Sequence, residues 1–154
     1  MASLSPRALA VSELIVEVFK ANGALLAAGD ALSRPAGLTS ARWQVLGVID
    51  HGALTVADAA RAMGLRRQSV QQTAEALVRD GLAAWRDNPR HRRARLLEPT
   101  PEGRRALAEV ERRHAEWADG LAAGLDPETL AAATAALRGL TTALESDGEA
   151  PHDR

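Results

Sequence analysis

The sequence contains no cysteine and few aromatic residues, and both absences narrow what the chain can be. Without cysteine it has no disulfide scaffold, no cysteine nucleophile, no thiol redox centre and no cysteine-ligated zinc. With one Phe, three Trp and no Tyr in 154 residues, the bulk of the core must come from Leu and Ala. Both are strong helix formers, and Ala is depleted in strands, so the composition favours packed helices.

Signals for metals, membranes, secretion and catalysis are also missing. The four His residues are scattered, with no His-x₃-His or His-x-Glu cluster, so we expect no metal site and no cofactor. No apolar run reaches about 18 residues, and charges interrupt the apolar stretch near the N-terminus, so neither a membrane span nor a signal peptide is predicted. The expected location is the cytoplasm. No Gly-rich phosphate loop, Gly-x-Ser-x-Gly motif or nucleophile–base pair points to an enzyme.

Charge is unevenly distributed, although the net charge is only −1. Residues 1–54 are neutral, residues 55–105 carry a net charge of +5, and residues 106–154 carry −6. This distribution indicates that only the middle of the chain meets an anion. Every basic residue except Lys20 is Arg, whose planar guanidinium can contact phosphate or guanine through two hydrogen bonds.

Hydrophobic spacing and capping residues predict six helices and one short hairpin in a single, mainly α domain over residues 1–154. The helices are expected from Ser5 to Ser33, from Thr39 or Ser40 to His51, from Thr55 to Gly64, from Arg66 to Arg79, from Thr100 onward and from Asp126 onward. Two strands, Ala83–Arg86 and Arg93–Leu97, flank a polar turn. Residues 147–154 are expected to form a disordered tail.

Residues 56–75 have the spacing of a helix-turn-helix motif. Ala60 lets two helices approach closely, Gly64 can take the left-handed conformation of the turn, and Val70 packs the second helix onto the first. A plain helical hairpin would show the same spacing. The polar helix that follows, and the basic hairpin of the size of a wing after it, favour DNA binding.

The candidate DNA-binding residues lie in this polar helix and in the hairpin turn. Arg can contact guanine and Gln can contact adenine through two hydrogen bonds each, and arginines of a wing can enter the minor groove or follow the phosphates. Solvated surface is the alternative in both places. The candidates are Arg66, Arg67, Gln68, Ser69, Gln71 and Gln72 in the helix, and Arg90, Arg92, Arg93 and Arg95 in the turn.

The two C-terminal helices carry heptad-like apolar stripes. The stripes comprise Leu107, Val110, His114, Trp117 and Leu121 in one helix, and Leu130, Ala133, Leu137, Leu140 and Leu144 in the other. They could cover the first helix of the same chain or pair with a second copy. We expect a homodimer, because long terminal stripes with little else to bury them need a partner surface.

Residues 5–146 resemble the multiple-antibiotic-resistance regulator (MarR) family, and five segments, in the family's order, carry the resemblance. They are residues 38–46 (LTSARWQVL), 54–60 (LTVADAA), 76–82 (ALVRDGL), 88–94 (NPRHRRA) and 100–103 (TPEG). The resemblance implies a winged helix-turn-helix homodimer, with dimerisation helices at 5–33 and 101–146 and a DNA-binding lobe at 38–100. It further implies a transcriptional regulator, usually a repressor on a pseudo-palindromic double-stranded site, released by a small, often aromatic, anionic ligand.

The wing departs from the family pattern. His91 and Asn88 stand where the family usually has Asp, and Trp85 stands where it usually has Arg. In the family's usual wing these carboxylates hold the arginine that corresponds to Arg93, and they are missing here. We hypothesise that this wing binds phosphate more than the family's usual wing does and is less preorganised.

The resemblance also implies an effector pocket between the dimerisation helices and the DNA-binding lobe. Phe19, Trp43 and His51 could contribute to it, with Arg42 as a carboxylate partner. The alternative is that Phe19 and Trp43 are ordinary core residues. The rival function is a winged-helix module for protein interaction, or an antirepressor, without specific DNA binding. The intact polar face of residues 66–72 argues against it.

Overall fold

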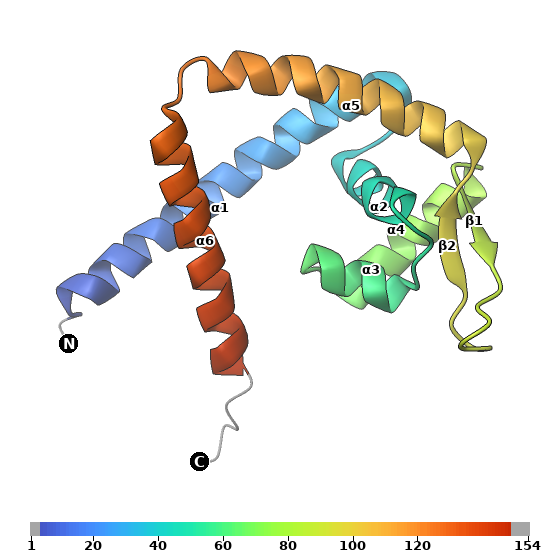
Figure 1. Cartoon of the computed structure of the whole chain (residues 1–154), viewed down its shortest axis with the longest axis horizontal. Coiled ribbons are helices and arrows are strands. Elements are labelled where there is room, and N and C mark those ends of the chain that lie inside the picture. Colours follow the sequence, from blue (N-terminus) through green and yellow to red (C-terminus); the bar gives the residue numbers. More distant parts are fainter. Residues whose placement is uncertain (1–3, 149–154) are drawn as a thin grey trace. The chain divides into compact units, whose positions relative to one another are not determined.

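The computed structural model describes residues 4–148, and these form helices and one small hairpin (Figure 1). The elements are α1 (Pro6–Ser33), η1 (Arg34–Ala36), α2 (Ser40–Asp50), α3 (Val56–Met63), α4 (Arg67–Arg79), β1 (Ala83–Arg86), β2 (Leu96–Pro99), α5 (Pro101–Ala122) and α6 (Pro127–Gly148). Residue contacts divide the chain into a first unit that ends at His114 and a second that begins at Ala115, and each is described by itself. No described helix is long and apolar enough to cross a membrane.

The helices begin where capping residues predict. In each case a side-chain oxygen accepts a hydrogen bond from the amide three residues further on, which satisfies a donor that the helix leaves unpaired. The pairs are Ser5 with Ala8 (3.2 Å), Thr39 with Arg42 (3.3 Å), Thr55 with Asp58 (3.1 Å), Thr100 with Gly103 (3.1 Å) and Asp126 with Thr129 (2.8 Å).

The helix-turn-helix prediction is confirmed. Ala60 and Val70 are both buried, at the contact between α3 and α4. Gly64 ends α3 with φ 62°, in the left-handed region that disfavours residues with a Cβ. The amide of Leu65 donates to the carbonyl of Ala60 (2.9 Å), which closes the turn.

The core of the first unit forms around α2. Val45, Leu46 and Ile49 on its inner face are fully buried, and α1, α3, α4 and β2 all contact this helix. Leu107 and Val110 of α5 belong to the same core, with exposures of 2% and 0%. The first part of the predicted α5 stripe is therefore buried inside the unit, and it leaves no surface there for a second chain.

The hairpin differs from prediction in its second strand. β1 has the predicted bounds, but β2 starts at Leu96, three residues later than expected, with Arg86 opposite Leu96. Arg93 and Arg95 therefore lie in the connecting loop, where the amide of Ala94 donates to the carbonyl of His91 (3.2 Å). Pairing starts only where apolar side chains can reach the core, and buried Leu97 also forms two backbone hydrogen bonds with Leu54.

The start of α5 packs closely against the end of the turn that precedes β1. A Cβ added at Gly103 would lie 1.9 Å from the carbonyl oxygen of Leu82, a distance that backbone atoms cannot relieve without moving. The same oxygen accepts a hydrogen bond from the amide of Thr100 (3.1 Å). This contact explains the glycine of the Thr-Pro-Glu-Gly segment.

Apolar side chains remain uncovered on helices of both units. On α1, Phe19 is 71% exposed, and on α6 the stripe residues Leu130, Leu137 and Leu144 are exposed. The predicted tail lies outside the described residues, except for Asp147 and Gly148, which form the end of α6 rather than a tail.

We predict that Gly103→Ala destabilises the protein by about 3 kcal/mol, because the new methyl group collides with backbone at a buried contact. Gly47→Ala, within α2, is the matched control, since a Cβ there meets nothing within 4 Å. The control should be neutral or stabilise by up to about 1 kcal/mol. Thermal and urea unfolding measure both variants, and equal stability of the two would contradict the close contact.

Candidate nucleic-acid interface

Helix α4 presents a polar face to solvent because its apolar residues face the core. Val70, Ala74 and Leu77 are buried, and they hold the helix against α2 and α3. Five of the predicted contact residues on this helix are exposed: Arg66, Arg67, Gln68, Ser69 and Gln72. Gln71 is half-buried, and its amide donates a hydrogen bond to Glu75 (2.7 Å). Among the described residues, the N-cap residue Arg66 forms no side-chain hydrogen bond to the amides of the first turn of α4.

The loop between β1 and β2, residues 87–95, forms a wing that carries the four predicted arginines. All four are exposed. The side-chain oxygen of Asn88 accepts a hydrogen bond from the amide of Arg90 (3.0 Å), and its backbone carbonyl accepts one from the amide of His91 (3.1 Å). Asn88 therefore shapes the wing backbone with its own side-chain oxygen, a role that an Asp at this position would also perform.

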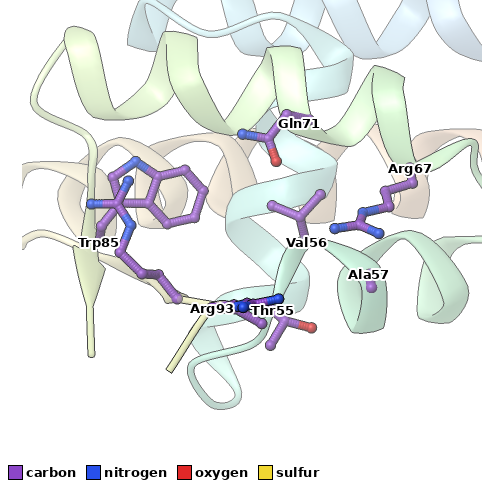
Figure 2. A pocket seen from close by; sticks show the side chains of 9 residues that line it. Thr55, Val56, Ala57, Arg67, Gln71, Trp85 and Arg93 are labelled. Atoms are coloured by element: carbon purple, nitrogen blue, oxygen red, sulfur yellow. The ribbon is translucent and has the colours of Figure 1, made fainter. Parts of the chain in front are cut away.

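A cleft of about 210 Å³ lies between α4, the wing and the start of α3. Figure 2 shows Arg67 and Gln71 of α4, Trp85 of β1 and Arg93 of the wing around it. The complete lining is Thr55, Val56, Ala57, Arg67, Gln71, Trp85, Arg93, Ala94 and Arg95. The structure thus brings four predicted contact residues to one place, and the other six predicted residues are not part of this lining.

The candidate arginines carry uncompensated charge. Within the part of the chain that the structure describes, none of the six forms an ion pair with a carboxylate: Arg66, Arg67, Arg90, Arg92, Arg93 and Arg95. Neighbouring basic residues do form such pairs, as Arg61 does with Asp58 (2.9 Å) and Arg86 with Glu98 (3.2 Å). The surface formed by α4 and the wing is therefore suited to an anion.

Helix α4 is also tied to α2 by an ion pair between residues far apart in sequence. Arg42, in the first turn of α2, donates a hydrogen bond to Asp80 at the end of α4 (2.6 Å). This hydrogen bond, with the charges of Arg42 and Arg79, holds the pKa of the Asp80 carboxyl below its usual value. Asp80 therefore stays ionised near neutral pH, and the pair persists there.

The four predicted ligand-binding residues occupy separate places in the first unit. Phe19 is exposed on α1, and Arg42 is engaged with Asp80. Trp43 packs against the core and meets the ring of His114 edge-on, with centroids 5.1 Å apart. His51 follows the last turn of α2, about 12 Å along the helix axis from Trp43.

Comparison with known proteins identifies the family. Residues 36–94 match the MarR family. The chain is 40% identical over 137 residues to the uncharacterized protein Rv2011c of Mycobacterium tuberculosis, and the match covers 89% of this chain and 96% of that protein. It is 30% identical to Sco5413, a MarR family transcriptional regulator from Streptomyces coelicolor, over 92% of this chain and 98% of that structure, with a TM-score of 0.75. The chain belongs to the MarR family.

A further solved structure matches this MarR-family chain at 25% identity. It is BpsR of Bordetella bronchiseptica, whose DNA binding is regulated by 6-hydroxynicotinic acid. The match covers 85% of this chain and 98% of that structure, with a TM-score of 0.68. The winged helix-turn-helix fold expected from the sequence is confirmed, and the chain is a DNA-binding transcriptional regulator by family.

Sequence reasoning missed two features of this MarR-family site. One is the Arg42–Asp80 pair, which joins residues 38 positions apart and gives no local signal. The other is the stacking of Arg95 on Trp85, in which the guanidinium carbon lies 4.9 Å from the ring centroid. Starting the second strand three residues too early hid this contact. With the observed register, Trp85 and Arg95 can be identified as diagonal neighbours across the hairpin.

We predict that His91→Asp makes DNA binding by this MarR-family protein less dependent on salt and changes its affinity. A carboxylate among the wing arginines competes with phosphate for them while restoring a partner for Arg93. His91→Asn is the matched control, because it changes the side chain without adding charge. Fluorescence anisotropy at several salt concentrations measures both quantities. If affinity and salt dependence both equal those of the wild type, the hypothesis of a phosphate-binding, less preorganised wing fails.

Proposed function

We propose that the protein is a sequence-specific transcriptional repressor that binds double-stranded DNA as a homodimer. The observation that carries this proposal is the convergence of unpaired arginines from α4 and the wing on one exposed surface. Phosphate contacts from such a surface position a protein on DNA, and contacts to base edges give specificity. Since the proposed target is chromosomal DNA, we also propose that it acts in the cytoplasm.

In this proposal α4 enters the major groove with its N-terminal end first. Arg67, Gln68 and Gln72 are then directed at base edges, while Arg93 and its wing neighbours contact phosphates or the adjacent minor groove. Two copies of α4 in a dimer would read half-sites about 34 Å apart on a pseudo-palindromic operator. An operator that overlaps a promoter allows repression by occupancy alone.

The proposed dimer uses the uncovered helices of the chain. Apolar residues on α1 and α6 are exposed along most of the length of both helices, Phe19 at 71% and Leu144 at 62%. Burying a residue of this size stabilises an assembly by about 1.5–3 kcal/mol. A second copy of the chain offers these helices matching apolar surface, in the manner expected of a homodimer.

We further propose that a small aromatic anion releases the repressor from DNA. The similarity to BpsR supports a ligand of this type. Trp43, next to Arg42 in sequence, offers an aromatic ring that already contacts His114, and Arg42 is bonded to Asp80 at the end of α4. An anion that competes with Asp80 for Arg42 would act directly on the placement of the recognition helix. Phe19 and His51 lie away from this position and would need another role.

We predict that Arg67→Ala weakens specific binding more than nonspecific binding, whereas Arg93→Ala mainly reduces the salt dependence. The reason is that a base contact contributes only at the correct sequence, about 1–3 kcal/mol, while a phosphate contact contributes at every sequence. Fluorescence anisotropy on duplex DNA from the gene's own upstream region measures this, with a shuffled duplex as control and two salt concentrations. Equal effects of both variants on both duplexes would refute the division of roles. No preference of the wild type for its own duplex would favour the protein-interaction alternative.

We predict that Leu137→Glu on α6 converts the dimer to monomer at micromolar concentration. The new charge would be buried at the proposed interface without a partner. Ala135→Glu is the matched control, because it adds the same charge to the same helix on its opposite face. Sedimentation velocity distinguishes the two states. A wild-type protein that sediments as a monomer, or a Leu137→Glu variant that stays dimeric, would contradict this interface.

A further inference from the structure

We infer that the cleft between α4, the wing and the start of α3 is a site for one backbone phosphate of DNA, with Arg95 as its clamp and Trp85 as the residue that positions Arg95. This inference rests on the proposed function. The phosphate would belong to the strand that passes between the groove read by α4 and the groove read by the wing. The site would fix the wing and the recognition helix on the same stretch of backbone.

The first argument is the arrangement of Arg95 and Trp85. Trp85 pairs with Leu97 in the hairpin, so Arg95, two residues before Leu97, is its diagonal neighbour. The guanidinium lies over the indole ring at 4.9 Å from the centroid, in a favourable cation–π position. A stack of this kind restricts the guanidinium without neutralising it, since its charge and hydrogen-bond donors remain available to an anion.

The second argument is that three positive charges converge on the cleft from two elements. Arg67 comes from the first turn of α4 and Arg93 from the wing (Figure 2), and Arg95 also comes from the wing. None of the three has a carboxylate partner among residues 4–148. The guanidinium groups of Arg93 and Arg95 can form charge-assisted hydrogen bonds to phosphate oxygens, while that of Arg67, directed at base edges, adds positive potential at the cleft. The positive charges of the three groups repel one another, and an anion in the cleft would offset this repulsion.

The third argument is the chemistry of the cleft floor. Thr55, Val56 and Ala57 line it at the start of α3, where backbone amides lack partners within the helix. The acidic residue nearest in sequence is already engaged. Asp58 accepts hydrogen bonds from Thr55 (2.7 Å) and Arg61 (2.9 Å), and the Thr55 hydrogen bond is the main cause that lowers its pKa. The volume of about 210 Å³ leaves room for a phosphate group and a few waters of about 30 Å³ each.

The test uses a double-mutant cycle on the full-length protein. Arg95→Met should weaken binding to the operator duplex about tenfold and to a shuffled duplex by a similar factor. It should also reduce the slope of log affinity against log salt by about 0.9 per cleft, or about 1.8 for a dimer. Trp85→Leu should produce a smaller loss of the same kind, and Trp85→Phe should retain most of the affinity, because a ring remains beneath Arg95.

The cycle distinguishes positioning from a structural role of Trp85. If Trp85 acts through Arg95, Trp85→Leu has no further effect in the Arg95→Met background. Trp85 is half-buried against the core, so circular dichroism and thermal unfolding accompany each variant. Arg95→Met, at an exposed site, is informative even if Trp85→Leu does not fold. Arg34→Met is the matched control, since Arg34 is also exposed, without an ion pair among residues 4–148, and is not part of the cleft lining.

A second measurement locates the phosphate. Duplexes with a single neutral methylphosphonate at successive backbone positions should show losses of wild-type affinity at several positions in each half-site, and Arg95→Met should abolish the loss at one of these positions alone. If Arg95→Met changes neither affinity nor salt slope while the wild type binds its operator, this inference fails and the proposed function stands. Additive effects of Trp85→Leu and Arg95→Met would refute the positioning role. Failure of the wild type to bind DNA overturns both proposals.

Discussion

The first unit depends on the burial of one face of α2. Val45, Leu46 and Ile49 are withdrawn from water almost completely, and α1, α3, α4 and β2 all pack on the helix that carries them. Complete burial of such residues contributes about 1.5–3 kcal/mol each. Because α4 and the hairpin rest on the same support, the distance between recognition helix and wing is fixed by this packing. The cleft between them is a consequence of the core.

Ion pairs at the two ends of α2 help to orient the neighbouring helices that pack on it. Arg42 pairs with Asp80 at the end of α4, and Asp50 pairs with Arg104 in α5. All four side chains are partly exposed, so the pairs contribute little to stability. Their value is geometric, because each pair joins α2 to a neighbouring helix at a defined turn.

The structure also divides the basic residues by their surroundings. Several arginines away from α4 and the wing, such as Arg105 and Arg113, pair with acidic residues one turn away on their own helix. Those of the α4 N-terminus and the wing have none among the described residues, and one of them is stacked on a tryptophan instead. Positive charge that is not neutralised within the protein can attract a polyanion, and salt screens this attraction. Net charge alone, at −1, gave no indication of this.

The sequence by itself determined what depends on local chemistry. Capping oxygens at Ser5, Thr55 and Thr100 set where helices begin, Gly64 set the turn of the helix-turn-helix motif, and the polar spacing of residues 66–72 set which face of α4 meets solvent. These are interactions within about four residues, and they are encoded in the order of the residues themselves.

Tertiary structure alone decided what depends on residues far apart in the chain. β2 starts at Leu96 because Leu97 is buried in the core and pairs with Leu54, and no local sequence pattern specifies these contacts. The resulting register places Arg95 over Trp85. The burial of Leu107 and Val110 inside the first unit, and the pairing of Arg42 with Asp80, arise in the same way. A strand register or an interhelical ion pair is a property of two surfaces in contact, and it exists only once the core has formed.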